Sequence, residues 1–276
     1  MPEKSVVKRH SELKKLISHH DDLYHAQDKP EISDYEYDQL FAELLELEKN
    51  NPTLDTSDSP SHRVGGLAIT QFQKVRHRLP MLSLANSYSP EDIVEFDERV
   101  KKLLRSDKTV EYFAELKLDG LSMELVYEKG SLIRALTRGD GLVGEDVTHN
   151  VKTIKSIPLK LKTKKPPELL EVRGEVLIFK KDFLEMNQAY EEQGMPVFAN
   201  PRNAAAGTVR QLDPKIAASR PLKFFAYSLG AVEGISFSSQ QNIEEQLADL
   251  GLPTLKKELT CCSSNVNDMF ESYHHL

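Results

Sequence analysis

The spacing of the apolar residues changes along this chain of 276 residues, and that change limits the folds it can adopt. Leu13, Leu16 and Ile17 share one face of a helix, and a second stretch from Tyr37 to Leu47 repeats the same spacing. Later in the chain the apolar residues form short runs separated by glycine turns, which is typical of strands. The sequence therefore predicts a helical N-terminal part followed by a part that mixes strands with helices.

Local signals mark both ends of the second helix. Ser33-Asp34-Tyr35-Glu36 has the pattern of a capping box, with Ser33 at the N-cap and Glu36 three residues later. Asn51-Pro52 ends the apolar stripe, and residues 55–66 are rich in Ser, Asp, Pro and Gly, which predicts a loop or linker. We therefore expect residues 1–71 to form a small helical domain and residues 72–276 to form a second domain.

The second domain is predicted to combine helices with antiparallel strands. Ser89-Pro90 begins a helix that runs to about Arg105, because proline suits the first helical position. The other expected elements are strands at 112–118, 121–127, 131–138, 169–179 and 222–229, a turn at 128–130 and a helix at 180–192. Because strands and helices do not alternate regularly, the predicted class is α+β.

The composition excludes a membrane protein and a disulfide-rich secreted protein. The longest apolar stretch, Phe224 to Val232, is far shorter than the roughly 20 residues of a spanning helix. The first five residues are polar and carry no apolar signal region. The two cysteines, Cys261 and Cys262, are adjacent and cannot alone form a disulfide framework or a zinc site. We therefore expect a cytoplasmic protein with no membrane contact.

The formal net charge of -7 is distributed unevenly. The first 70 residues carry eight basic and fourteen acidic side chains, so the rest of the chain is nearly neutral. Residues 147–165 contain six lysines and no carboxylate. Such a stretch could meet the phosphate backbone of a nucleic acid, or it could be a solvated edge strand and loop. Both interpretations stay open at this point.

The run from Glu115 to Gly120 places a lysine where a predicted strand meets a glycine turn. Strand alternation predicts that Glu115, Lys117 and Asp119 lie on one face. The two carboxylates could hold the amine as a structural ion pair, or they could position it as a nucleophile. A lysine nucleophile must lose its proton, which requires burial or neighbouring positive charge.

Three further polar runs change the balance between these interpretations. They are Thr137 to Gly141, Glu171 to Val176, and Asn200 to Gly207, the last of which is predicted to be a loop. Lys117, Arg138 and Arg202 are suited to phosphate oxygens, and the glycine turns allow close approach. Glu115 and Glu175 could accept from an adenine amine, bind ribose hydroxyls or hold Mg²⁺. Each run alone could be a turn or a buried ion pair, but four together favour a nucleotide site.

One motif in this region is misleading. Gly139 to Gly144 spells G-x-G-x-x-G after a predicted strand. A dinucleotide fold would continue with a long helix and an acidic residue about 20 positions on, whereas the chain has only lysines and prolines near Lys164. The sequence therefore argues against a Rossmann site and against hydride transfer.

At these residues the sequence resembles the bacterial NAD-dependent DNA ligases, and the resemblance extends over essentially the whole length. The run from Glu115 to Gly120 looks like the nucleotidyltransferase motif whose lysine becomes adenylylated, and Val75 to Leu84 is similar to another signature of the family. Tyr24-His25 and Asp34 to Asp38 look like the family's clamp for nicotinamide mononucleotide (NMN), which ATP-dependent ligases lack. The resemblance implies a helical NMN-binding domain followed by a nucleotidyltransferase domain, similar to ATP-grasp folds.

The resemblance also implies roles for individual residues. Lys117 would attack the adenylyl phosphorus of NAD, which is consumed as the AMP donor, and would release NMN. The implied binding residues are Tyr24, His25, Asp34, Tyr37 and Asp38 for NMN, Ser83, Leu84, Glu115 and Tyr227 for the adenine, Glu175 for the ribose, and Asp119, Gly120, Arg138, Arg202 and Arg210 around the phosphates. Glu175 and Asp119 are candidate ligands for Mg²⁺, and no zinc is expected in this part of the family's sequence.

Residue chemistry alone leaves the clamp undecided. Asp34, Tyr37 and Asp38 share one helix face, where tyrosine could stack on a pyridinium and carboxylates could face its positive charge. Tyr37 also continues the apolar stripe of Leu40 and Phe41, so it could simply belong to the core. The family resemblance favours the clamp.

The sequence departs from the family pattern in a few places. Ala85 stands where the family usually has Asp, and Ser122 replaces a common Ala. Leu142-Val143 replaces a common Thr pair. The chain ends at Leu276, before the family's later lysine motifs, so we expect an N-terminal piece of a monomeric ligase whose partner is nicked double-stranded DNA. The alternatives are a nucleotide-binding fragment without chemistry, an ATP-dependent nucleotidyltransferase of the capping type, and a Schiff-base enzyme.

Overall fold

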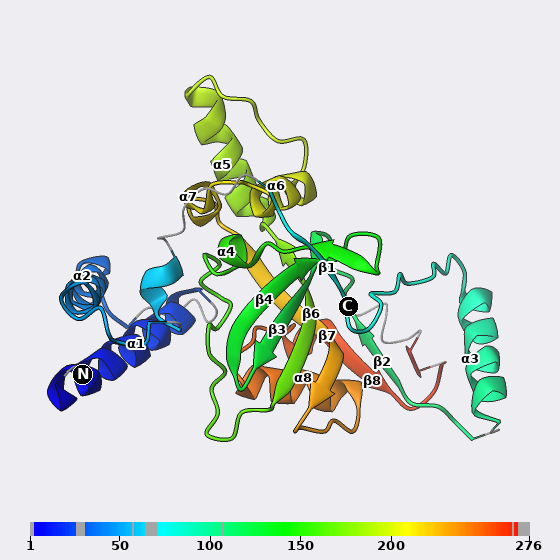
Figure 1. Cartoon of the computed structure of the whole chain (residues 1–276). Helices are drawn as coiled ribbons and strands as arrows, with labels where there is room; N and C mark the ends of the chain where they lie inside the picture. The colour runs from blue at the N-terminus through cyan, green and yellow to red at the C-terminus, as the bar shows by residue number, and fades with distance from the viewer. Residues whose placement is uncertain are drawn as a thin grey trace.

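The fold was obtained as a computed structural model, which describes residues 3–25, 31–56, 58–63, 71–105, 108–266 and 268–269. Figure 1 shows a pair of helices at one end, a central antiparallel sheet with helices around it, and a separate helix at the other end. The predicted α+β class is confirmed. The division after residue 71 stays a proposal.

The N-terminal helices form where the apolar spacing predicts them. Helix α1 spans Lys4–His25, α2 spans Asp34–Asn50, and a short 3-10 helix, η1, spans Pro60–Arg63. The capping box is present, because Ser33 accepts from the backbone N–H of Glu36 and the Glu36 side chain accepts from the backbone N–H of Ser33. Leu13, Ile17 and Leu44 are fully buried between the two helices. This packing uses the apolar faces recognised in the sequence, except that Leu16, expected on the same face as Leu13 and Ile17, is 38% exposed.

Two carboxylates connect the helices with the segment around η1. Glu48 on α2 lies 2.8 Å from His10 Nε2 on α1 and accepts from the hydroxyls of Ser59 and Ser61, each at 2.5 Å. Asp58 pairs with Lys14 at 2.5 Å. Asp58 also lies 3.3 Å from Lys160, which belongs to the second part of the chain. The helical part is therefore held as much by buried polar contacts as by its small core.

The central sheet has four antiparallel strands in the order β4-β3-β6-β7. Its strands are β3 (Leu121–Glu128), β4 (Ser131–Thr137), β6 (Leu169–Leu177) and β7 (Lys223–Glu233). The hairpin predicted around residues 128–130 is confirmed as the β3–β4 connection. The largest apolar cluster lies on this sheet and includes the fully buried Met123, Leu125, Tyr127 and Phe224. The sheet is the rigid base from which the site described below is built.

Two small sheets and several helices surround the central sheet. Strand β1 (Lys74–Arg76) pairs with β5 (Val143–Glu145), and β2 (Tyr112–Glu115) pairs with β8 (Thr260–Ser263), both antiparallel. The helices are α3 (Pro90–Leu104), α4 (Thr148–Val151), α5 (Lys180–Glu192), α6 (Pro201–Val209), α7 (Pro214–Ala218) and α8 (Gln240–Asp249), with the 3-10 helix η2 at Lys257–Leu259. The predicted helices at 89–105 and 180–192 are confirmed.

Two local predictions were wrong. The segment from Asn200 to Gly207, predicted to be a loop, belongs to α6: Asn200 caps the helix, proline occupies its first turn and alanines fill its interior. The strand predicted to run to residue 118 ends at Glu115, because its partner β8 begins opposite that residue. Strand alternation therefore does not extend to Lys117 and Asp119.

The basic stretch 147–165 contacts the helical part of the molecule. The segment holds α4 and irregular backbone, with an isolated bridge between Ser131 and Lys160, so the expected edge strand is reduced to one residue pair. The ammonium group of Lys155 lies 5.3 Å from the centroid of the Tyr37 ring. Together with Lys160 and Asp58, this contact joins the two parts of the chain.

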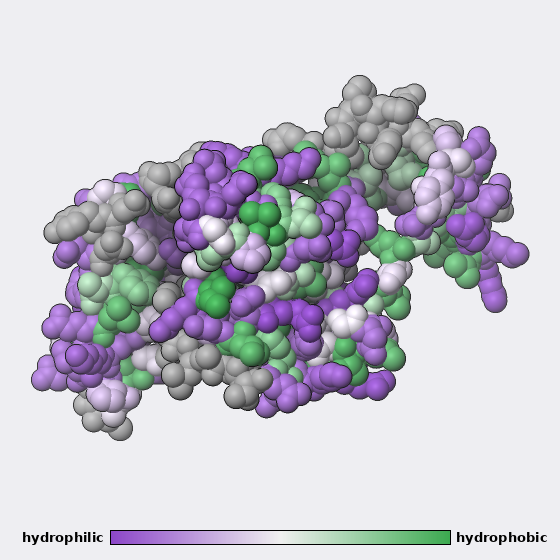
Figure 2. Space-filling model, turned by 90° about the horizontal axis from the view of Figure 1, so that it is seen from above, coloured by the Kyte–Doolittle hydropathy of each residue, from purple (hydrophilic) through white to green (hydrophobic). Residues whose placement is uncertain are grey.

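Polar side chains cover most of the face drawn in Figure 2, where apolar side chains appear in small groups. Among the described helices, none is both long enough and apolar enough to span a bilayer.

Candidate functional site

A cavity of about 1120 Å³ opens beside the central sheet, between the ends of several strands. Its wall receives residues from the β2–β3 connection, the β4–β5 turn, β6, β7, α6 and α8. Ten residues singled out in the sequence line it: Ser83, Leu84, Glu115, Lys117, Gly120, Arg138, Glu175, Arg202, Arg210 and Tyr227. Residues spread over almost 150 positions of sequence are thus brought to one surface.

Lys117 projects from the irregular segment between β2 and β3 and is exposed. Within the described ranges, no hydrogen bond or ion pair involves its ammonium group. The carboxylates expected to hold it are engaged elsewhere: Asp119 lies 3.3 Å from Arg202, and Glu115 faces Glu244 of α8. The structural ion pair considered from the sequence is therefore not formed, and the amine is available to a ligand in the cavity.

The backbone beside Lys117 is fixed by a glycine. The amide of Gly120 donates to Glu175 Oε1 at 3.1 Å, which ties the β2–β3 connection to strand β6. A Cβ atom on Gly120 would lie 2.2 Å from the carbonyl oxygen of Val176, so any side chain there would force the strands apart. Burial raises the pKa of Glu175, and the Gly120 amide and the positive charge of Lys117 offset part of this rise. Glu175 is thus a partly buried carboxyl group directed at the segment that carries Lys117.

The β4–β5 turn places Arg138 at the cavity. The carboxylate of Asp140 accepts from the amides of Leu142 and Val143 at 2.9 and 2.8 Å, and these bonds lower its pKa. Gly139 has a φ of 57°, and a Cβ atom there would lie 1.8 Å from the Val143 carbonyl oxygen. The G-x-G-x-x-G run is therefore a tight turn that leads into strand β5, as expected from its lack of a Rossmann context.

The other two arginines are contributed by α6. Arg202 lies near the start of the helix and pairs with Asp119, whereas Arg210 at its end donates to Glu145 at 2.8 and 3.0 Å. The guanidinium groups of Arg138, Arg202 and Arg210 thus border one cavity. Such a group of cations is suited to a ligand with several phosphate oxygens.

Tyr227 forms an aromatic part of the cavity wall. Its hydroxyl lies 2.6 Å from the Ser122 hydroxyl, and burial raises its pKa. Gln240 of α8 donates to its backbone carbonyl at 2.6 Å. The hydroxyl and the backbone of Tyr227 are therefore both fixed by hydrogen bonds. A ring fixed in this way provides a flat surface that suits a purine.

A buried polar network, which the sequence did not reveal, supports the segment that carries Ser83 and Leu84. Glu124 on β3 lies 2.8 Å from His77 Nδ1 and 3.2 Å from Arg173 Nε. Arg173 also donates to the carbonyls of Leu79 and Pro80 at 2.6 and 3.1 Å. Ser83 in turn lies 3.4 Å from Arg138 Nη1. A buried glutamate within an apolar strand was the available signal, but its partners come from distant segments.

The predicted NMN clamp lies on α1 and α2. Both helices form, so Asp34, Tyr37 and Asp38 share a helix face as predicted. The side chains of Tyr24, His25, Asp34 and Asp38 lie outside the described part of the structure. Tyr37 packs on the core of the helical part, stacks on Phe41 with centroids 6.2 Å apart, and donates to Asp21 at 2.8 Å. Its ring also faces Lys155, so a core role and a ligand role are both compatible with this position.

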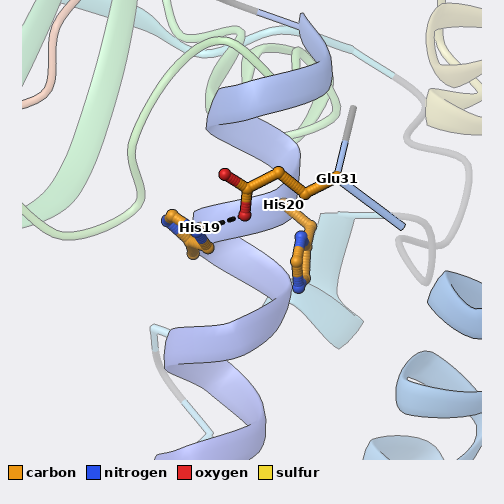
Figure 3. Close-up of side chains that lie close together, drawn as sticks. All are labelled: His19, His20 and Glu31. Atoms are coloured by element: carbon orange, nitrogen blue, oxygen red, sulfur yellow. Dashed lines mark ion pairs between the residues drawn. The ribbon is translucent and has the colours of Figure 1, made fainter. Parts of the chain in front are cut away.

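Two sets of residues could be considered as metal ligands. Glu175 lines the cavity, whereas Asp119 does not line it but pairs with Arg202 of its wall. Mg²⁺ is commonly held by one or two carboxylates together with substrate phosphates. This donor set therefore fits the Mg²⁺ that the family resemblance implies. Figure 3 shows a second group, His19, His20 and Glu31, whose donor atoms lie within 4.8 Å of one another. Two donors of one zinc ion are at most about 4.2 Å apart, so 4.8 Å does not by itself define a formed site.

Two family models match this chain. The model of the NAD-dependent DNA ligase adenylation domain matches residues 69–276. The chain belongs to this family. A second model, described as a DNA ligase-like N-terminal NAD+-binding domain, matches residues 3–65. The resemblance recognised from the motifs is confirmed.

Several DNA ligases are similar to this adenylation-domain chain along nearly its whole length. The DNA ligase of Bdellovibrio bacteriovorus is 65% identical over 272 residues, which is 98% of this chain and 40% of the relative. The DNA ligase of Geobacter sulfurreducens is 49% identical over 92% of this chain and 38% of the relative. That of Acetivibrio thermocellus is 47% identical over 98% and 40%. The chain thus spans about 40% of the length of these ligases.

Proposed function

We propose that this chain carries out the adenylation step of an NAD-dependent DNA ligase. The observation that carries the proposal is the position of Lys117, whose amine pairs with none of the described residues and lies in a cavity bordered by three arginines, a partly buried glutamate and an aromatic ring. The neutral amine attacks the adenylyl phosphorus of NAD. A bond forms between Nζ and phosphorus, and Nζ releases one proton to solvent. The bond to the NMN phosphate oxygen breaks, and NMN leaves with that electron pair.

The residues around the cavity divide the work of this step. Glu115, Ser83, Leu84 and Tyr227 receive the adenine, and Glu175 receives the ribose. Arg138, Arg202 and Arg210 offset the charge that develops on the phosphoryl oxygens. When bound, Mg²⁺ supplies further charge neutralisation at these oxygens, and Glu175 and Asp119 would hold it. Tyr24, His25, Asp34, Tyr37 and Asp38 of the helical domain, residues 1–71, hold the NMN half.

The later steps belong to the longer ligase. AMP would pass from Lys117 to the 5′-phosphate at a nick in double-stranded DNA, and the neighbouring 3′-hydroxyl would displace it. We propose that the protein acts as a monomer in the cytoplasm, in DNA replication and repair. The relatives named DNA ligase support the steps at the nick.

Intact-protein mass spectrometry tests the adenylation step. After incubation with NAD and Mg²⁺, we expect the mass to increase by one adenylyl group. The Lys117→Ala variant should show no increase, whereas Lys180→Ala, which removes an exposed lysine outside the cavity wall, should behave as the parent. Binding of NAD without any adduct would favour a binding fragment. Equal labelling by ATP would contradict the role of the NMN clamp.

A further inference from the structure

A hydrogen bond between two hydroxyl groups joins strands of the central sheet that are not neighbours. Ser122 lies on β3 and Tyr227 on β7, and both line the cavity. Their hydroxyl oxygens are 2.6 Å apart, and within the described part of the chain this is the only hydrogen bond of either hydroxyl. Strand β6 lies between β3 and β7, so the contact crosses a whole strand.

Tyr227 reaches this partner at a point where β7 is irregular. In the pairing with β6, Ala226 lies opposite Gly174 and Ser228 lies opposite Arg173, so Tyr227 is an extra residue on β7. An extra residue of this kind forms a bulge, which redirects the side chain that it carries. The direction of the Tyr227 side chain is thus set by the bulge and not by the ordinary alternation of a strand.

The span of this contact determines how the Tyr227 side chain lies. Neighbouring strands are about 4.8 Å apart, so β3 and β7 are separated by roughly 9.6 Å. The side chains of a strand normally stand almost perpendicular to the sheet. A tyrosine in that orientation would end far from β3, whereas a hydrogen bond to Ser122 requires the ring to lean across β6. The ring is therefore held across β6, in the wall of the cavity that both residues line.

Ser122 is the group that fixes the outer end of this ring. The hydrogen bond from Gln240 reaches only the backbone carbonyl of Tyr227, so it leaves the ring free to turn. The bond to Ser122 removes that freedom before a ligand arrives. A side chain that is already ordered loses less conformational entropy on binding, so a fixed ring binds an aromatic base more tightly than a mobile one.

We propose that Ser122 is a positioning residue for the purine base, which holds the Tyr227 ring across β6 as a preformed stacking surface. The inference rests on the proposed function, because it takes the cavity to receive the adenylyl half of NAD. Ser122 acts through Tyr227 and not through a contact of its own with the ligand. Its effect is therefore confined to ligands that carry the base, and the binding of NMN does not depend on it.

Calorimetric titrations with AMP and with NMN test the proposal, because only AMP carries the purine. We expect Ser122→Ala to weaken AMP binding by about two- to tenfold, as for the loss of one hydrogen bond, and to leave NMN binding unchanged. Tyr227→Phe keeps the ring and removes the same bond from its other end, so it should weaken AMP binding by a similar factor. Ser131→Ala changes a serine of β4 outside the cavity wall and should leave both affinities unchanged.

The double variant separates a positioning role from a direct contact. If Ser122 acts through Tyr227, the variant that combines Ser122→Ala with Tyr227→Phe should bind AMP as weakly as either single variant and no more weakly. Losses that add together would show that Ser122 contacts AMP itself, and they would overturn the positioning role.

Other results would also overturn the inference. Unchanged AMP affinity in Ser122→Ala, verified as folded by its melting curve, removes the role of Ser122. An equal loss of AMP and NMN affinity indicates a merely structural role. If Ser122→Ala does not fold, Tyr227→Phe takes its place in the same comparison of AMP with NMN. Failure of the parent chain to bind AMP contradicts the proposed function itself, whereas a parent that binds AMP and a variant that binds it equally well contradict only the inference.

Discussion

The part built on the central sheet and the part built from α1 and α2 are stabilised by different kinds of interaction. Among the described residues, the cluster on the central sheet contains 24 buried apolar side chains, whereas the cluster between α1 and α2 contains three, so the helices depend much more on each single contact. The helical part compensates with paired charges, such as Arg9 with Glu43 at 2.6 Å and Lys14 with Asp58 at 2.5 Å. A site on the sheet is therefore held by a large core, and a site on the helices is held by a few polar contacts.

This difference fits the chemistry that we propose for each part. Attack on phosphorus requires the amine, the arginines and the phosphate to keep a fixed geometry, which a well-packed sheet provides. Release of NMN requires its binding residues to separate from it. A weakly packed pair of helices can rearrange for this more easily than a sheet with a large core. Perturbing each part separately should therefore have separable consequences.

The largest effect is expected from the core of the helical part. Leu44 is one of the three fully buried apolar side chains in the described portion of this part. Leu44→Ala should destabilise this part by about 2–5 kcal/mol, because the lost burial and the new cavity add together. Thermal unfolding monitored by circular dichroism should show a lower first transition. Leu45→Ala, at a position that is 47% exposed, serves as the control and should have little effect. Loss of adenine binding in Leu44→Ala would show that the two parts are not separable.

A smaller but still large effect is expected in the sheet. A Cβ atom on Gly174 of β6 would lie 2.3 Å from Phe224 Cζ and from the Phe225 carbonyl oxygen. Gly174→Ala should therefore cost about 1–3 kcal/mol through overpacking. In contrast, Gly207→Ala in α6 meets Phe198 only at 3.6 Å and should stabilise the helix by about 0.5–1 kcal/mol. Melting temperatures that move in the same direction in both variants would contradict this account.

The third effect depends on pH and concerns Glu48. Burial acts to raise the pKa of this group, but the hydrogen bonds from Ser59, Ser61 and His10 outweigh burial and lower it. Its stabilising contribution is therefore present above the unfolded pKa of about 4.3 and is lost as the pH falls through the lower folded value. Glu48→Gln should cost about 2 kcal/mol at pH 7, and the cost should shrink towards pH 3.

Urea denaturation of the parent and Glu48→Gln at several pH values measures this dependence. Glu46→Gln on the same helix, at an exposed position, is the matched control and should show no such trend. A cost that stays constant between pH 7 and pH 3 would mean that the charge of Glu48 does not stabilise the helical part.

The sequence predicted the elements whose signals are local. The Ser33 capping box and Asn51 give the bounds of α2, and the turn at 128–130 gives the β3–β4 hairpin. The missed helix α6 had a local signal too, since Asn200-Pro201 is an N-cap followed by proline, the pattern that was correctly used for α3. That prediction failed because the small residues were taken as a loop signal and not as favourable helix formers.

Features that depend on distant partners could not be predicted from local patterns. Strand β2 ends at Glu115 because β8 pairs only up to that residue, and β8 lies about 145 positions later. The hydroxyls of Ser122 and Tyr227 meet for the same kind of reason, and nothing near either residue signals the contact. Residue chemistry alone pointed to Glu115, Lys117, Arg138, Glu175 and Arg202, and the family resemblance added others. The structure places ten of the residues so named in the wall of one cavity. Their roles in binding stay predictions.

The smallest effect concerns the contact between the two parts of the molecule. The ammonium group of Lys155 lies 5.3 Å from the Tyr37 ring, where a cation gains about 0.5–1 kcal/mol at an exposed site. The nicotinamide of NMN is also a cation, so the two would compete for this ring. Lys155→Ala should therefore strengthen NMN binding by about two- to fivefold in a calorimetric titration. Lys164→Ala removes the same charge from an exposed position elsewhere in the basic stretch 147–165 and should leave NMN affinity unchanged.

The outcome separates the two interpretations of Tyr37. If Tyr37 stacks on the nicotinamide, Tyr37→Leu should weaken NMN binding and abolish the gain seen in Lys155→Ala, because both effects act through one ring. If Tyr37 only completes the apolar stripe with Leu40 and Phe41, neither variant should alter NMN affinity, and both should change only the unfolding transition of the helices. An equal gain in affinity from Lys155→Ala and Lys164→Ala would instead point to general electrostatics of the basic stretch, and the specific contact with Tyr37 would then carry no functional weight.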